Sequence, residues 1–402
     1  MATLPPASRH VPALMDELLE EIFIRLPIDD PAILFRAALV CKSWHRLVSG
    51  PALRRRLLDF HGSPPLRGFF CRVGSEPASR FVPASSSSSL RRLSAGNVTP
   101  RWRPVDSLHG CVLIEDQDAP GLQDMHINLV MWNPTGGEVR RLPTAPLLTY
   151  WWNATLICTA LGCDHLDCGS GPFQVVLAGT GLSNDWVTSV CVYSSEQRAW
   201  SKPVSAWFYC FRVKVGSSAS TVLGNALYFL CDTMRKILEY DLHKQELSLI
   251  SLPNPDGIVW DWHAAVIRAE GGRIRIALTL YSKVYMWSRE SANLDNGDAR
   301  WVQQRVIEID KMIPAWDHTV SFSSPYVSAV AEHVGVMFVD MCNGLFSIDL
   351  KSGLVTKSLV GNYMIREVVP YVSFCIPAFG SRAAFAGDQE PIASALSAGK
   401  LI

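Results

Sequence analysis

The sequence lacks an imbalance of charge and a long apolar run. Lysine and arginine together number 37, and aspartate and glutamate also number 37, so charge gives no case for binding nucleic acid or a membrane surface. No apolar stretch reaches the roughly 20 residues that a membrane-spanning helix needs. Residues 1–12 contain no apolar run either, so we expect no signal peptide.

The sequence also lacks the short motifs of common catalytic and metal sites. The one concentration of metal-ligating residue types is Cys163-Asp164-His165-Leu166-Asp167-Cys168, and no second Cys/His pair follows at a zinc-site spacing. We interpret it as a solvent-exposed loop and predict no metal and no cofactor. The 11 cysteines are an odd number and lie mostly in strand-like segments, which favours reduced, buried thiols in a cytoplasmic or nuclear protein.

What the sequence does contain, near its beginning, is a set of short amphipathic helical patterns. The first places its apolar residues on one helix face: Leu18, Leu19, Ile22, Phe23 and Leu26. Pro27 ends it, and Asp30-Pro31 is typical of the start of a second helix. A unit this small cannot bury every apolar helix face by itself. The remaining exposed apolar surface predicts a partner protein. The alternative is that these helices simply cap the domain that follows them.

These helices carry two sequence blocks in a specific order. The first runs from Leu14 to Pro27 and the second is Val40-Cys41-Lys42-Ser43-Trp44-His45-Arg46-Leu47-Val48. Together they resemble the F-box, the module that docks onto a Skp-type adaptor in cullin-RING ubiquitin ligases. Met15 and Phe23 depart from the family pattern but stay apolar. The resemblance implies an adaptor-facing set of Leu14, Leu18, Ile22, Leu26 and Pro27, with Val40, Trp44 and Leu47 completing the fold or the contact.

After residue 60, short apolar and aromatic runs alternate with Gly, Pro, Asn and Asp turns, which predicts an all-β region. Equivalent turns between paired strands, at Asn133, Ser194, Asp241, Ser288 and Asp349, recur at intervals of 47 or 61 residues. A repeat of this length with about four strands is typical of a β-propeller blade. The pattern resembles the kelch-like propellers that follow the F-box in many plant proteins, although it lacks the double-glycine kelch signature.

The predicted fold is therefore multidomain, with a small helical F-box followed by a propeller of six to eight blades of short antiparallel strands, six or seven being favoured. Residues 67–108 and 360–376 would supply further blades, one of them closed by strands from both ends. The predicted organisation is a disordered N-terminus (1–12), the F-box domain (13–58), a linker (59–66), the F-box-associated propeller (67–378) and a flexible tail (379–402).

A second periodicity places aromatic clusters between consecutive blades. The clusters are Tyr150-Trp151-Trp152, Trp207-Phe208-Tyr209, Trp260-Asp261-Trp262-His263 and Trp316-Asp317-His318. Connections between blades lie on one face of a propeller, so these side chains would surround the mouth of its channel. We predict that Tyr150, Trp151, Trp152, Trp207, Tyr209, Trp260, Trp262 and Trp316 bind a protein substrate. Packing between blades is the alternative.

The resemblance implies a non-catalytic, substrate-recruiting subunit of an SCF-type ubiquitin ligase. Its partners would be the Skp-type adaptor and, through it, cullin and the RING protein, with the propeller holding an unidentified substrate. Two alternatives stay open: an F-box scaffold that acts outside a ligase, and a propeller lectin or enzyme with a helical cap.

Overall fold

The structure is a computed structural model. It describes residues 14–28, 30, 32–74, 76, 79–84, 101–118, 125–134, 137–160, 163, 171–181, 186–208, 212–213, 220–231, 235–253, 262–267, 273–290, 299–313, 325–331, 334–341, 343–360 and 365–374.

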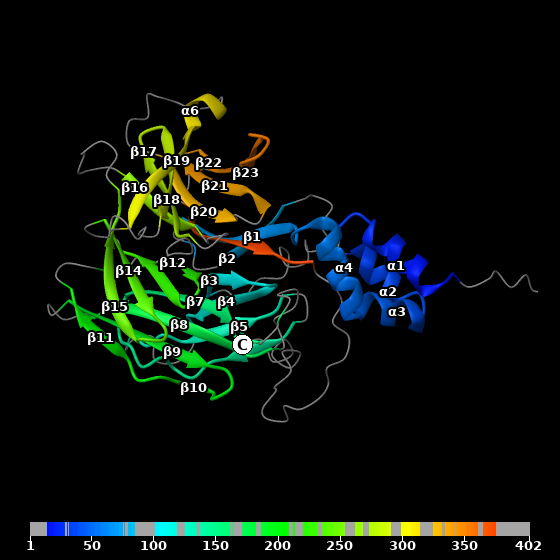
Figure 1. The fold of residues 1–402 in the computed structure, drawn as a ribbon, viewed down its shortest axis with the longest axis horizontal. Coiled ribbons are helices and arrows are strands. Elements are labelled where there is room, and N and C mark those ends of the chain that lie inside the picture. The colour runs from blue at the N-terminus through cyan, green and yellow to red at the C-terminus, as the bar shows by residue number, and fades with distance from the viewer. Residues whose placement is uncertain are drawn as a thin grey trace, which may run out of the picture.

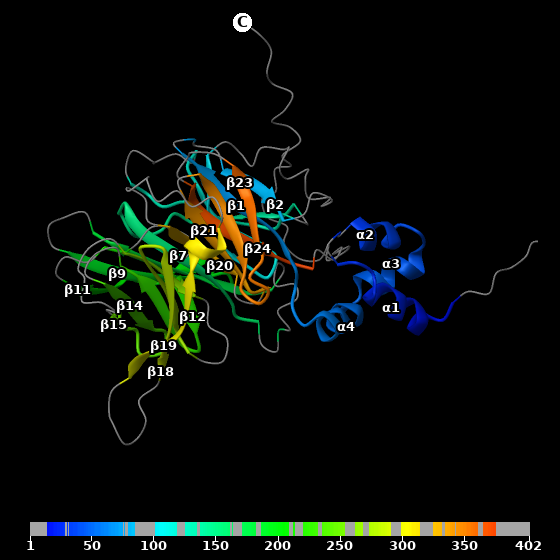
Figure 2. The same ribbon diagram turned by 90° about the horizontal axis from the view of Figure 1, so that it is seen from above.

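Four short helices form the N-terminal unit, and they gather on one side of the strand domain (Figures 1 and 2). They are α1 (Asp16–Ile24), α2 (Ala32–Ala38), α3 (Lys42–Ser49) and α4 (Pro51–His61). The Asp30 carboxylate accepts a 3.0 Å hydrogen bond from the Ala32 N–H at the start of α2, and Pro51 occupies the first turn of α4. These two helix starts therefore follow from local sequence.

The apolar residues of α1 divide between two faces of the helix. Leu19 and Phe23 are buried in the helical core, where the Phe23 ring meets Trp44 edge-on with centroids 5.2 Å apart. Leu18 and Ile22 point outward and are 47% and 48% exposed. The sequence places all four on one broad stripe, but the core formed with the other helices covers only half of its width.

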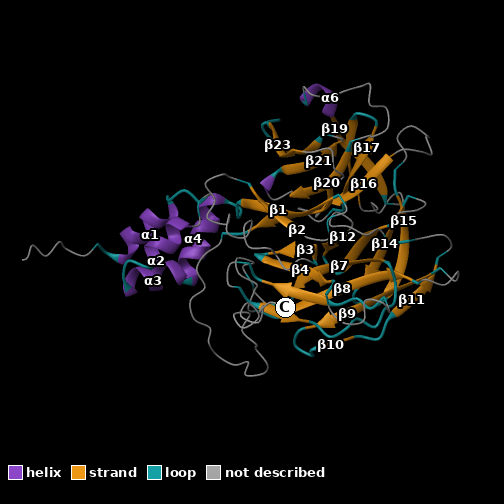
Figure 3. Ribbon diagram, turned by 180° about the vertical axis from the view of Figure 1, so that it is seen from behind, coloured by secondary structure: helices purple, strands orange, loops and turns teal. Residues whose placement is uncertain are grey.

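In the described part of the chain, twenty-four strands build six antiparallel sheets around one axis (Figures 1 and 3). The first sheet has β3 (Trp102–Leu108), β4 (Cys111–Asp116), β5 (Leu129–Trp132) and β6 (Val139–Arg141). The second has β7 (Trp151–Cys158), β8 (Phe173–Thr180), β9 (Val187–Ser194), β10 (Ala199–Trp200) and β11 (Val204–Trp207). The third has β12 (Ser220–Leu223), β13 (Ala226–Leu230), β14 (Lys236–Asp241) and β15 (Glu246–Ser251).

The remaining three sheets complete the ring. The fourth has β16 (Trp262–Ile267), β17 (Arg275–Leu280), β18 (Lys283–Glu290) and β19 (Arg300–Glu308), which α6 (Ile309–Met312) follows. The fifth has β20 (Tyr326–Ala331), β21 (Val336–Met341), β22 (Gly344–Asp349) and β23 (Val355–Val360). The sixth joins β1 (Leu66–Val73) and β2 (Ser79–Pro83) to β24 (Ile365–Val372).

This architecture confirms the predicted helical region followed by a propeller, and it fixes the number of blades at six. The sixth blade takes strands from both ends of the region, in the order β2-β1-β24, so the ring is closed by the chain's own pairing. Apolar clusters fill the spaces between neighbouring blades; one of them joins Leu113 of β4 to Trp152 of β7. Each blade is a separate sheet whose inner strand lies at the centre of the ring, an arrangement that leaves only short, protected strand edges.

The six inner strands, β24, β3, β7, β12, β16 and β20, begin at one face of the propeller, which we call the entry face. Arg103, at the beginning of β3, contacts Glu367 near the beginning of β24. His263, near the beginning of β16, meets Tyr326, the first residue of β20, with ring centroids 4.9 Å apart. At the other end of the same sheet, Leu66 pairs with Val372, so β1 begins and β24 ends where the helices join the propeller.

The junction between helices and propeller is organised by Arg67, which is only 3% exposed. Its Nε donates to the Ser373 carbonyl at 2.7 Å and its Nη2 to the Phe374 carbonyl at 2.8 Å. Its Nη1 donates to the carbonyl of Ile28, in the turn after α1. The Phe374 side chain is buried in the helical core. One side chain on β1 thereby holds together the helical unit and the two ends of the propeller.

Replacing Gly68 by alanine should destabilise the closing blade. Gly68 has φ +155°, and a Cβ there would lie 2.3 Å from the Val82 carbonyl oxygen across the β1–β2 pair. We expect Gly68→Ala to lower the free energy of unfolding by roughly 2–5 kcal/mol, as judged from urea unfolding. Gly137→Ala is the matched control, because φ is +70° there and nothing lies within 4 Å. Equal losses in the two variants would show that the contact with Val82 is relaxed in solution.

Removing the Arg67 guanidinium should uncouple the two domains. Arg67→Met leaves three carbonyl groups without their donor, so the helices should melt at a lower temperature than the propeller. Calorimetry of the variant should then resolve two transitions in place of one. Arg80→Met, which removes an exposed ion pair with Glu76, should leave the wild-type profile unchanged. A single transition in the Arg67 variant would contradict the assigned role.

Candidate partner-binding surfaces

The helical unit exposes apolar side chains along the outer side of α1 and at the turn after α2. On α1 these are Leu18 and Ile22, and directly before it Leu14 and Met15. Leu39 and Val40, at the end of α2, are 77% and 63% exposed. Large apolar residues concentrated in this way on one small unit are typical of a surface that a partner covers. We call these six residues the helical apolar surface.

The predicted adaptor-facing residues fall into two groups in the structure. The first group belongs to the helical apolar surface: Leu14, Leu18, Ile22 and Val40. Pro27, in the turn that follows α1, is also exposed. The other three are partly buried and pack on the helical core: Leu26, Trp44 and Leu47. Sequence reasoning did not select Met15 or Leu39, although both are apolar residues at positions where the helical stripe faces solvent.

Charged residues tie α1 to α4 beside this surface. Arg56 of α4 reaches Glu20 at 2.9 Å and Glu21 at 2.6 Å. Arg25, near the end of α1, pairs with Glu21 and lies over the Phe60 ring, 5.9 Å from its centroid. These ion pairs are partly solvent-exposed, so they orient the helices more than they stabilise them.

The aromatic residues predicted to bind substrate have different surroundings on the entry face. Tyr150 and Trp207 are 64% and 62% exposed, and Trp151 is half-buried at the beginning of β7. Trp152 is 4% exposed and packs in the core between the first two blades. It cannot contact a partner in this arrangement, so packing between blades describes it. Trp262 begins β16; Tyr209, Trp260 and Trp316 lie outside the described residues.

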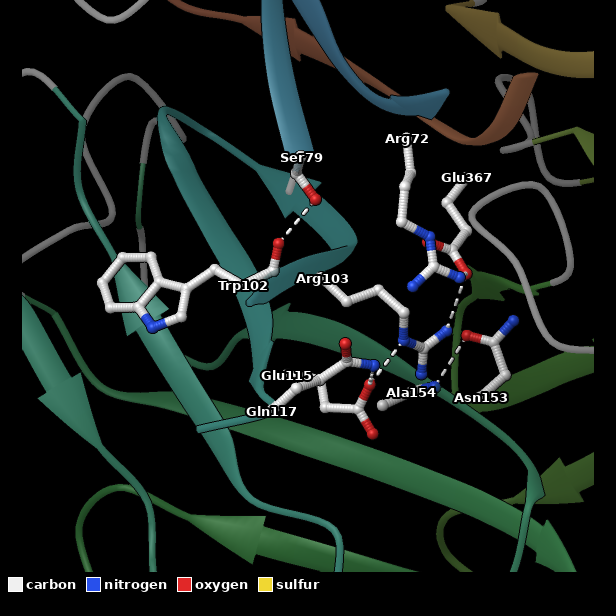
Figure 4. A network of polar contacts seen from close by, with 9 residues as sticks. All are labelled: Arg72, Ser79, Trp102, Arg103, Glu115, Gln117, Asn153, Ala154 and Glu367. Atoms are coloured by element: carbon white, nitrogen blue, oxygen red, sulfur yellow. Dashed lines mark hydrogen bonds and ion pairs between the residues drawn. The ribbon is translucent and has the colours of Figure 1, made fainter. Parts of the chain in front are cut away.

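Beneath the entry face, Arg103 is the centre of a buried polar network (Figure 4). Its Nε donates to Glu115 at 2.6 Å, and its Nη1 lies 3.4 Å from Glu367, which also pairs with Arg72 at 3.0 Å. The guanidinium lies over the Trp152 ring, 4.6 Å from the centroid. Burial lowers the pKa of Arg103, but the two carboxylates outweigh that effect and the net pKa is raised. This network fastens three neighbouring blades.

A second arginine, Arg212, lies between two tryptophans at the entry face. Its Cζ is 4.0 Å from the Trp151 ring centroid and 5.4 Å from that of Trp186. The next residue, Val213, donates its N–H to the Thr180 hydroxyl at 3.2 Å, which fixes the backbone beside Arg212. Sequence reasoning found Trp151 but neither of the other two residues, because nothing in their spacing relates them.

Asp340, at the end of β21, is a carboxyl group with an altered pKa. Burial raises its pKa to about 7, while hydrogen bonds from the Ile365 and Met341 N–H groups act in the opposite direction. The Ile365 N–H donates to Oδ2 at 3.0 Å, and Oδ1 has no hydrogen-bond partner among the described residues. The carboxyl therefore joins the fifth blade to the beginning of β24 and is neutral over part of the physiological pH range.

The described part of the chain contains no group of three or more His, Cys, Asp or Glu residues placed to hold a metal. Of the metal-ligating segment singled out in the sequence, only Cys163 is described. Among the described residues, no helix is both long and apolar enough to cross a bilayer. The geometry points to binding surfaces, one apolar on the helices and one aromatic on the propeller.

Comparison with known proteins agrees with the division of the chain. Residues 16–59 match the F-box-like family model. The F-box/LRR-repeat protein At2g43260 of Arabidopsis thaliana is 23% identical over 381 residues, covering 90% of this chain and 82% of that protein. The F-box protein At5g49610 of the same plant is 25% identical over 246 residues, covering 60% of this chain and 64% of that protein. Plant F-box proteins are thus distant homologues.

Among solved structures, the extracellular domain of the one-component system BT4673 from B. thetaiotaomicron aligns with a TM-score of 0.32 and 12% identity. The alignment covers 66% of this chain but only 29% of that one. The match of residues 16–59 to the F-box-like model and the strand topology together describe an N-terminal helical F-box region followed by a six-bladed β-propeller.

Asp340 should make stability depend on pH. Because its folded-state pKa lies above the ordinary value of 3.8, its contribution is present below about pH 4 and is lost as the pH rises through about 7. Asp340→Asn keeps the acceptor for the Ile365 N–H but cannot ionise. We expect the free energy of unfolding of this variant to fall by about 2–4 kcal/mol less than that of the wild type as the pH rises. The measurement is urea unfolding at pH 5 and pH 8.

Asp349→Asn is the control for this experiment. The pKa of Asp349 is lowered, chiefly by a hydrogen bond from the Ser352 backbone N–H. Its contribution to stability is therefore lost only as the pH falls below the range in which an aspartate ordinarily titrates. This variant should have the same pH 5 to pH 8 difference as the wild type. The assignment to Asp340 fails if both variants and the wild type change stability in parallel over this interval.

Proposed function

We propose that this protein is a substrate-recruiting, non-catalytic subunit of an SCF-type ubiquitin ligase. The observation that carries the proposal is the exposed stripe of Leu14, Leu18 and Ile22 on a helical unit that matches the F-box-like model. F-box domains in general bind a Skp-type adaptor through apolar helical surface. Leaving these side chains in water is unfavourable, and an adaptor that covers them relieves that cost.

In this role the chain contributes proximity and no bond-making chemistry. The helical apolar surface binds the Skp-type adaptor, through which cullin and the RING protein are attached. The propeller holds the substrate, which raises the effective concentration of its lysines near the ubiquitin thioester on another subunit. Helices and entry face lie at opposite ends of the sixth blade, so both surfaces are available at once.

Two further features belong to the proposal. The resemblance to kelch-like propellers stays a prediction, which rests on the four-stranded repeat. A cytoplasmic or nuclear location is supported by the buried free thiols of Cys71 and Cys191, because these compartments keep thiols reduced. A scaffold outside a ligase would use the same helices, and binding of cullin separates the two roles.

Charges on the outer face of α1 should abolish adaptor binding. Leu18→Asp with Ile22→Asp places two carboxylates where the adaptor would bury them, and we expect affinity to fall at least about a hundredfold. The measurement is the affinity of the full chain for a Skp-type adaptor, followed by capture of cullin by the complex. The fold should survive, because both side chains are already exposed.

The matched control is Val306→Asp with Leu354→Asp, which adds two charges at exposed apolar positions of the propeller. It should bind the adaptor as the wild type does. Wild-type chain that binds adaptor but never captures cullin would favour the scaffold. Wild-type chain that binds no adaptor would sink the proposed role and leave the helices as a cap.

A further inference from the structure

We propose that the entry face recognises an acidic residue, Asp or Glu, that stands beside a bulky apolar residue in an extended peptide, and that Arg212 reads the carboxylate. The inference rests on the proposed function, because it names the chemistry of the substrate that the propeller would hold. It comes from the group formed by Arg212 with Trp151 and Trp186, together with the exposed rings of Tyr150 and Trp207. We call these five residues the arginine–aromatic patch.

The guanidinium of Arg212 packs on two indole rings. Its Cζ lies within stacking distance of Trp151 and also lies over the Trp186 ring. Of the cation–ring contacts between described residues, only that of Arg212 involves two indoles. A guanidinium held through its faces keeps its in-plane N–H groups available, and these match the two oxygens of a carboxylate.

The donors of Arg212 are not used within the described part of the protein. Its Nε is buried and has no hydrogen-bond acceptor there, and none of the ion pairs between described residues includes Arg212. Arg103 is a useful contrast, because it also lies on a tryptophan but is neutralised by Glu115 and Glu367. Arg103 is structural, whereas Arg212 has no carboxylate partner among the described residues.

Hydrogen bonds constrain the backbone next to the arginine–aromatic patch. Trp186 has φ +49°, in the left-handed region that bulky residues rarely adopt, and its carbonyl accepts from the Phe208 N–H at 3.3 Å. Strain of this kind, maintained by surrounding contacts, is concentrated at binding sites. Val213 is fixed in turn by Thr180 and by a bridge to Cys231. These contacts constrain the backbone at Trp186 and at Val213, the residue after Arg212.

The apolar part of the ligand follows from the exposed rings. Trp207 pairs with Val187 in the β9–β11 ladder, immediately next to Trp186, and Tyr150 directly precedes Trp151. Both are more than half exposed, which suits them to packing against an apolar side chain of a partner. A single guanidinium favours a carboxylate over a phosphate, because phosphate recognition commonly uses several cations together.

The test uses the full chain and three immobilised libraries of short synthetic peptides with randomised flanks. One library fixes a central Glu-Leu pair, the second fixes Gln-Leu and the third fixes phosphoserine-Leu. We expect the wild type to select peptides from the Glu library and to bind the best of them roughly 10- to 100-fold more tightly than their Gln counterparts. Arg212→Gln should remove that preference for Glu, whereas Arg212→Lys should retain part of it.

Two further variants test whether the stack itself matters. Trp186→Gly removes one indole at a position whose φ suits glycine, so the fold should be retained while the Glu preference weakens. Arg300→Gln is the matched control, since Arg300 is an exposed arginine at the far end of β19 from the entry face. It should leave selection unchanged. Thermal unfolding of every variant checks that the propeller is intact.

Each remaining outcome overturns the inference. Equal binding of Glu and Gln peptides, a Glu preference that survives Arg212→Gln, tighter binding of phosphoserine peptides, or capture of no peptide would each contradict carboxylate recognition. Adaptor binding by the same preparations separates this failure from failure of the ligase role. A chain that binds adaptor but shows no Glu preference remains a candidate ligase subunit with a different substrate site.

Discussion

The arrangement of the whole molecule depends on one buried guanidinium, that of Arg67. A cation that is 3% exposed is tolerated only when its donors are satisfied, and here three backbone carbonyls from two separate segments accept from them. Each carbonyl gains a charge-assisted hydrogen bond that a neutral donor could not match in strength. Phe374 adds apolar contact, because its side chain is buried among the helices while its carbonyl accepts from Arg67. Polar and apolar forces thus act on the same residue.

This junction also determines how the helices are oriented relative to the propeller. A flexible linker would let the helices sample many orientations. Arg67 restricts the freedom, since it ties the turn after α1 to the strand pair that closes the propeller. The entry face lies at the other end of that blade, where Glu367 holds Arg103. The junction with the helices and the entry face therefore lie at the two ends of one strand, β24.

The sequence predicts the elements of this fold better than it predicts their contacts. Alternating apolar runs between turns indicate the strands, because a half-buried strand has a period of two whatever it packs against. The same period separates Trp151 from Trp152, but which of the two faces outward depends on the neighbouring blade. Leu18 and Leu19 pose the same difficulty on α1. Arg67 and Arg212 were not singled out at all, since an arginine's role depends on acceptors and rings that come from distant parts of the chain.

Closure of the ring and positioning of the helices are consequently one event. Two of the three acceptors of Arg67 follow β24, and 306 residues separate Arg67 from Ser373. The acceptors come into place only when β24 has paired with β1, and that pairing completes the sixth blade. Until then Arg67 has neither carbonyl, and Phe374 is absent from the helical core. The helical unit therefore gains its full set of contacts with Arg67 and Phe374 only when the propeller is closed.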